Sequence, residues 1–242
     1  MTILSADAPT PGDLTPNIWM SLIWILLMFA FQIVGLILAV LLNVALGFET
    51  DIWSPTNANP VTLMLGVLIG NSMLIAIRAK YLAAHFKRIQ HLWHIGISTG
   101  AVLAMLAINW IYEVLLIGKS VQPSNELIVD AIRTSPAGAL YVFFAVAISA
   151  PILEEILFRG QLQSALKGLA IKRELQEPGK IAMVIAAALF AAIHLQPLAF
   201  PILFTSGLAM GWIREKTGSI TLPILIHMVM NTVGVLAMLF AG

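Results

Sequence analysis

Seven stretches of this chain are apolar and long enough to cross a lipid bilayer, which limits the folds open to it. A spanning helix needs about 20 apolar residues, at about 1.5 Å per residue. Within hydrocarbon the backbone must satisfy its own hydrogen bonds, so each stretch is expected to be helical. The sequence therefore predicts an all-α, polytopic integral membrane bundle of about seven transmembrane helices. In chain order the stretches are 18–47, 61–79, 95–117, 137–166, 181–196, 199–213 and 220–240.

The composition supports a membrane as the solvent of this chain. Hydrophobic residues make up 60% of it and charged residues only 10%, whereas soluble domains contain about 25% charged residues. The net charge of +1 and the absence of a basic block give no sign of nucleic acid as a partner. Cysteine is absent, which excludes disulfides and thiolate metal ligands.

The distribution of basic residues predicts the orientation of the helices. Of the 13 Lys and Arg residues, ten lie at or after the ends of the second, fourth and sixth stretches, and two lie in the opposite loops. Basic loops stay in the cytoplasm, so we expect a cytoplasmic N-terminus and an external C-terminus, in the plasma membrane. Residues 1–17 contain no Lys or Arg, so a cleaved signal peptide is not expected.

Two segments between the apolar stretches are also interpretable. Residues 123–133 (PSNELIVDAIR) predict a short amphipathic helix on the outer surface. Residues 166–180 predict a basic cytoplasmic connector. The fifth and sixth stretches are short and separated by Pro197 and Pro201, so they are interpreted as a broken hairpin.

Charged side chains inside the fourth stretch need an explanation, because a charge at the bilayer centre costs about 2.5–3.5 kcal/mol. PILEEILFRG, residues 151–160, contains Glu154, Glu155 and Arg159. Glu155 and Arg159 are four residues apart, the spacing of a helical ion pair. Glu154 is turned away by about 100° and has no local partner. Both acids could simply join helices, but one ion pair would suffice for that.

Two histidines in later stretches fall at a similar depth. His194 follows Phe190 at four residues in FAAIH, and Asn231 follows His227 at four residues in HMVMN. At 1.5 Å per residue, Glu154 is about 18 Å from the cytoplasmic end, His194 about 20 Å and His227 about 12 Å. A lone membrane histidine usually joins two helices. Two of them in one layer with an unpaired acid predict a functional site.

These three motifs resemble those of a known family. EEILFR, FAAIH and HMVMN match, in order, the EExxxR, FxxxH and HxxxN motifs of the CPBP (CAAX protease and bacteriocin-processing, Abi) family of Rce1-like intramembrane proteases. The resemblance covers roughly residues 136–240. It implies that 136–242 form the CPBP/Abi-like catalytic core and that 1–135 supply N-terminal transmembrane helices and the amphipathic segment.

The resemblance also implies an activity, namely an endopeptidase acting on membrane-associated proteins or peptides, CAAX-type or prenylated substrates included. Glu154 and His194 would then activate water, and His227 and Asn231 would stabilise the oxyanion. Glu155, Arg159 and Phe190 would have supporting roles.

Other membrane functions fit the sequence less well. The absence of an HExxH motif excludes a zinc protease of the site-2 type, and the absence of Asp from every stretch excludes a presenilin-like aspartate dyad. A rhomboid-like Ser206–His227 pair is disfavoured, because residue 204 is Phe where the GxS loop of that type has glycine. A transporter should have internal pseudo-symmetry, and none is detected. A non-proteolytic membrane scaffold or immunity protein of the same family remains the alternative.

A metal is the remaining question for the expected site. Glu154, Glu155, His194 and His227 could bind zinc on residue type. However, Arg159 is spaced to pair with Glu155, and a cation beside a metal site weakens it. We therefore expect no cofactor and no tightly bound metal, with zinc as the alternative.

Overall fold

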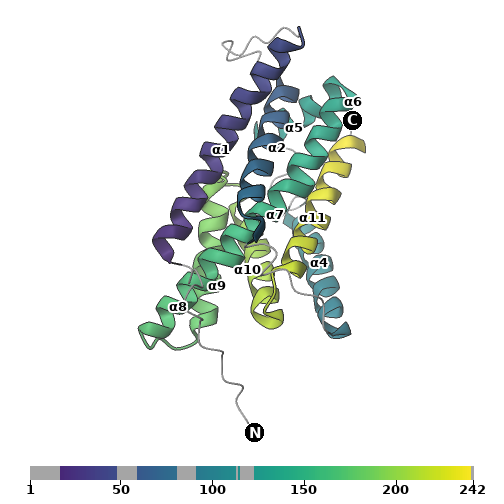
Figure 1. The fold of residues 1–242 in the computed structure, drawn as a ribbon. Coiled ribbons are helices and arrows are strands. Elements are labelled where there is room, and N and C mark those ends of the chain that lie inside the picture. The colour runs from purple at the N-terminus through teal and green to yellow at the C-terminus, as the bar shows by residue number, and fades with distance from the viewer. Residues whose placement is uncertain (1–16, 48–58, 81–90, 113, 115–122, 241–242) are drawn as a thin grey trace.

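A computed structural model describes residues 17–47, 59–80, 91–112, 114 and 123–240, and these residues form a helical bundle without strands (Figure 1). Its longest helix, Pro136–Lys172, is a continuous run of five segments. These are α6 (Pro136–Val142), η2 (Phe143–Ser149), α7 (Ala150–Glu155), η3 (Ile156–Leu162) and α8 (Gln163–Lys172), where η marks π-helical turns. The other helices are α1 (Ile18–Ala45), α2 (Pro60–Ile77), α4 (Leu92–Tyr112), α5 (Pro123–Thr134), α9 (Pro178–Ile193), α10 (Phe200–Thr217) and α11 (Thr221–Phe240).

The expected membrane bundle is confirmed. Among the described residues five helices are long and apolar enough to cross a membrane: α1, α2, α4, Pro136–Lys172 and α11. The other two predicted stretches are the shorter helix α9 and helix α10, which has charged residues in its last turn. The start of α1 and the end of α11 lie at opposite ends of the bundle (Figure 1).

Helices α1 and α2 pack against each other through glycines. A Cβ atom on Gly35 would lie 2.2 Å from the carbonyl oxygen of Gly66, and one on Gly70 would lie 2.3 Å from that of Phe31. Only glycine permits this approach, which is the usual way for helices to pack in lipid. The pair covers one side of the long helix.

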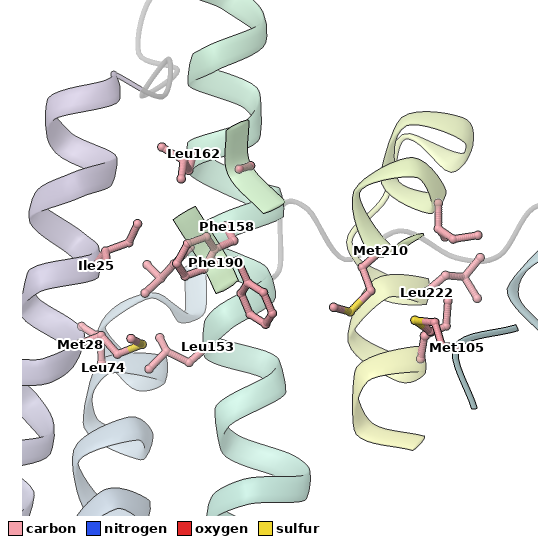
Figure 2. Packing of buried hydrophobic residues seen from close by; sticks show 14 residues of the cluster. Ile25, Met28, Leu74, Met105, Leu153, Phe158, Leu162, Phe190, Met210 and Leu222 are labelled. Carbon is pink, nitrogen blue, oxygen red and sulfur yellow. The ribbon is translucent and has the colours of Figure 1, made fainter. Parts of the chain in front are cut away.

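Apolar side chains join this pair to the long helix. Figure 2 shows Ile25 and Met28 of α1 and Leu74 of α2 facing Leu153 and Phe158, all of them buried in one cluster. The residues that flank the two glutamates are therefore part of the main core of the bundle.

The structure corrects three boundaries. The long helix continues to Lys172 and the next begins at Pro178, so most of the predicted connector 166–180 is helical. No proline lies between Pro151 and Pro178 to stop the helix. Helix α10 likewise extends to Thr217, beyond the predicted end at 213. The predicted amphipathic helix is present as α5: it packs Ala131 and Ile132 against Val142 and Val235, while Glu126 and Asp130 are exposed.

Candidate active site

Glu154 and Glu155 lie at the C-terminal end of α7, between the π-helical turns η2 and η3. A π turn contains one more residue than an α turn, is rare, and occurs frequently at functional sites. Here one helix contains such a turn on each side of the two acids. The sequence analysis used α-helical spacing and did not predict either turn.

Pro151 explains why the helix is widened before the glutamates. The N–H of Ala150 donates to the carbonyl of Ala145, five residues earlier. The next donor in this pattern would be residue 151, but proline has no N–H. The carbonyl of Val146 thus lacks a helical donor, and Nδ2 of Asn231 donates to it from α11 at 2.8 Å. Asn231 therefore joins α11 by a hydrogen bond to the helix that contains Glu154 and Glu155.

The structure contains the expected ion pair between Glu155 and Arg159. Nη1 of Arg159 lies 3.0 Å from Oε1 of Glu155, and both side chains are buried. Nη2 of Arg159 donates to the carbonyl of Gly207 on α10 at 3.2 Å. The guanidinium also lies 4.5 Å from the centroid of the Phe190 ring on α9. A buried charge needs such compensation, so Arg159 holds α9 and α10 against the long helix.

His227 of α11 lies between the two glutamates. Its Nδ1 is 3.0 Å from Oε1 of Glu155, and its Nε2 is 3.8 Å from Oε2 of Glu154. The ion-paired carboxylate of Glu155 can only accept, so Nδ1–H is the donor. Nε2 is therefore the ring nitrogen that faces Glu154. The separation of 3.8 Å is too long for a direct hydrogen bond and is compatible with a shared water.

Glu154 and Glu155 differ in access as well as in partners. The side chain of Glu154 is 15% exposed and that of Glu155 is 0% exposed. Within the described part of the chain, Glu154 forms no ion pair with a Lys or Arg. Glu155 is occupied by Arg159 and His227. Glu155 is therefore committed to contacts inside the bundle, whereas the carboxylate of Glu154 is partly accessible.

His194 is held differently from His227. It lies at the end of α9, and its Nδ1 is 2.7 Å from the carbonyl oxygen of Phe190. A carbonyl only accepts, so Nδ1–H is the donor, and in the neutral tautomer of this imidazole Nε2 is the acceptor. The Phe190 ring separates the two histidines, with centroids 4.9 Å from His194 and 5.9 Å from His227. Among the described residues, no hydrogen bond or ion pair joins His194 to Glu154.

Arg214 is a site neighbour that the sequence analysis placed in a cytoplasmic turn. It belongs to α10, and its Nε donates to the carbonyl of Arg159 at 3.1 Å. Its Nη2 donates to Oγ of Ser164 at 2.6 Å. Arg214 thus supports the π-helical turn that contains Arg159. The apolar stretch ended one residue earlier, so hydropathy gave no signal for this role.

The residue types of the site do not by themselves form a metal centre. Over the described ranges, no group of three or more His, Cys, Asp or Glu side chains is arranged to hold a metal ion. Oε1 of Glu155 contacts Arg159 and His227, whereas its Oε2 is buried and has no hydrogen-bond partner in the part of the chain that the structure describes. Catalysis without a metal stays a prediction.

Acids and histidines from three separate helices thus lie together inside a helical membrane protein, and one family model matches the part of the chain that contains them. Residues 136–233 match the family described as Type II CAAX prenyl endopeptidase Rce1-like. This match confirms the resemblance to the Rce1-like family that the three motifs predicted for this part of the chain.

One curated relative supports the same assignment. The chain is 31% identical over 118 residues to the membrane-embedded CAAX protease MroQ of Staphylococcus aureus (strain USA300). The match covers 47% of this chain and 44% of the relative, so it spans less than half the length of that protein. No solved structure matches the chain.

Proposed function

We propose that this chain is an intramembrane endopeptidase that hydrolyses membrane-associated proteins or peptides with a water molecule activated by Glu154. The observation that supports this most is the buried series Arg159–Glu155–His227–Glu154, whose last member is the most exposed of the four. Such a series fixes the geometry of one reactive carboxylate while the other charges compensate one another.

The proposed reaction consumes one water molecule. Glu154 accepts a proton from the water as its oxygen attacks the peptide carbonyl carbon. The resulting oxyanion is stabilised by hydrogen bonds from His227 and Asn231. Glu154 then gives the proton to the amine nitrogen as the C–N bond breaks. The new carboxylic acid passes its remaining proton to the amine, so the products are a carboxylate and an ammonium group, and Glu154 returns to its starting state.

The charges of the site are compatible with these roles. The proposed role requires His227 to carry a hydrogen on both nitrogens, and two positive and two negative side chains would then balance. Nδ1–H is then engaged by Glu155, and Nε2–H is available to the oxyanion. Asn231 uses one amide hydrogen on Val146 and keeps a second. The unprotonated Nε2 of His194 provides a second acceptor for the water.

The substrate class follows from the relative and from the setting of the site. The relative's printed name is that of a CAAX protease, and the site lies within a membrane-embedded helix bundle. We therefore propose membrane-associated proteins or peptides as substrates, with CAAX-type, prenylated chains as the first class to test.

Comparing the N-terminal peptides of membranes tests the proposed function. Cells expressing wild-type protein should contain new protein N-termini that are absent with Glu154→Ala at matched expression. Glu177→Gln, which alters a surface acid paired with Lys180, should give the wild-type pattern. Identical patterns for wild type and Glu154→Ala would instead favour the non-proteolytic scaffold or immunity protein.

A metal prediction accompanies this mechanism. Purified protein should contain no stoichiometric zinc, and exhaustive chelation should leave cleavage within about twofold of the untreated rate. Elemental analysis together with the cleavage rate before and after chelation tests this. Stoichiometric zinc whose removal stops cleavage would require Glu154, His194 and His227 to be reassigned as ligands.

The orientation predicted from the basic loops can be tested with reporters. A reporter fused after Lys172 should be cytoplasmic, and one fused after Gly242 should be external. The ends of α8 and α11 lie toward opposite ends of the bundle, which supports placing the two reporters on different sides of the membrane (Figure 1). Both reporters on one side of the membrane would contradict the proposed orientation.

A further inference from the structure

A chain of polar side chains crosses the apolar core beside the long helix. Nε2 of Gln32 on α1 donates to Oδ1 of Asn71 on α2 at 3.1 Å, and Nδ2 of Asn71 donates to Oγ of Ser149 at 3.2 Å. The Ser149 hydroxyl donates to the carbonyl of Ala145 at 2.9 Å. Asn71 is 1% exposed and Ser149 is 5% exposed. This chain therefore connects both N-terminal helices to η2.

The end of this chain lies at the turn that precedes the reactive acid. Ala145 accepts from Ser149, and the next carbonyl, that of Val146, accepts from Asn231. Two consecutive carbonyls of η2 are thus bonded to side chains. The carbonyl of Ala145 accepts from Ser149, which Asn71 of α2 contacts, and the carbonyl of Val146 accepts from Asn231 of α11. Ser149 precedes Glu154 by five residues, about 7.5 Å along a helix.

Holding this turn in the π form has a geometric consequence for Glu154. A π turn contains one extra residue, so its conversion to an α turn would shift the following helix by one residue. Such a shift rotates each later side chain by about 100°. Glu154 would then no longer be directed toward His227.

The geometry points to Asn71 as a positioning residue that keeps η2 in its π-helical form and thereby directs Glu154 at the substrate. This inference rests on the proposed function for its catalytic consequence. Asn71 does not touch the reacting atoms and acts through Ser149. It also assigns α2, which contains none of the three motifs, a part in the active site.

A second hydrogen bond between the same two helices provides a matched control. Nδ2 of Asn43 on α1 donates to Oγ1 of Thr62 on α2 at 2.8 Å. This bond joins α1 to α2 without contacting η2. Asn43→Leu and Asn71→Leu therefore each remove one asparagine amide from the α1–α2 pair, and only the second also removes a contact with the long helix.

Two measurements on purified protein in detergent test the inference. The first uses ¹⁵N-histidine labelling, with the imidazole signals of His227 assigned from their loss in His227→Gln. Asn71→Leu and Ser149→Ala should move the His227 signals, and Asn43→Leu should leave them in place.

The second measurement is the cleavage rate of a transmembrane peptide with a quenched fluorophore. The peptide contains a cleavage site found by comparing the protein N-termini of membranes. Asn71→Leu should lower kcat about tenfold with KM within about twofold, and Asn43→Leu should leave both near wild type.

Unchanged His227 signals in both Asn71→Leu and Ser149→Ala would overturn the inference, and so would equal changes in Asn43→Leu. If Asn71→Leu does not fold, Ser149→Ala tests the same link from the long helix. The histidine signals require no cleavage, so the inference can fail while the enzyme remains active. Conversely, absent cleavage by wild type would reject the proposed function alone, and the histidine signals would still decide the position of Glu154.

Discussion

Replacing Arg159 by methionine is expected to lower the free energy of unfolding by about 3–5 kcal/mol. The variant leaves the fully buried Glu155 without its cation, and it removes the contacts of the guanidinium with Gly207 and Phe190. Methionine fills much of the same volume, so the loss reports mainly on the charge. The measurement is the unfolding free energy in detergent.

A surface pair in the same bundle is the matched control for this prediction. Lys167 and Glu215 form an ion pair at 2.6 Å with side chains 37% and 18% exposed. Such pairs contribute about 0–1 kcal/mol, so Lys167→Met should change the unfolding free energy little. The double variant Glu155→Gln/Arg159→Met should recover part of the loss, because no unpaired charge remains. Equal effects of Arg159→Met and Lys167→Met would contradict the structural role of the pair.

Glu154→Gln is expected to lower the rate of peptide cleavage by about 10²–10⁴-fold. Glutamine keeps the shape of the side chain and its hydrogen-bonding capacity but cannot accept the proton of water. The unfolding midpoint should stay near that of wild type, because Glu154 is partly exposed and its described ionic neighbour, His227, lies 3.8 Å away. Both quantities are measured on the same preparation.

Glu155→Gln separates the roles of the two acids. It should lower the unfolding midpoint, because Arg159 stays buried without its carboxylate. Full cleavage by Glu154→Gln would end the proposed mechanism. Equal stability of the two glutamine variants would contradict only the division of roles between Glu154 and Glu155.

The helices and one contact of the site follow from the sequence for simple physical reasons. Apolar length fixes a spanning helix, because the bilayer thickness is fixed. The spacing of Glu155 and Arg159 predicted their ion pair, because residues four apart share a helix face. Both inferences use local spacing, which the sequence contains directly.

The remaining features depend on contacts between distant segments. The π turn η2 depends on Pro151 and on the amide of Asn231, which bonds to the Val146 carbonyl from 85 residues away along the chain. Asn71 and Arg214 also act on the long helix from other helices. In a hydropathy profile Asn71 is an isolated polar residue within an apolar stretch, and Arg214 is a cation in a loop. Their roles became visible only once their hydrogen-bond partners were known.

The origin of the oxygen in the new carboxylate tests the central claim most directly. Wild-type protein in excess would cleave the quenched transmembrane peptide once in H₂¹⁸O, followed by mass spectrometry of the product and of the peptide containing Glu154. Attack by a water that Glu154 activates places ¹⁸O in the product carboxylate and none in Glu154. Labelled oxygen in the Glu154 side chain would show that the glutamate attacks the peptide itself, which would contradict the mechanism.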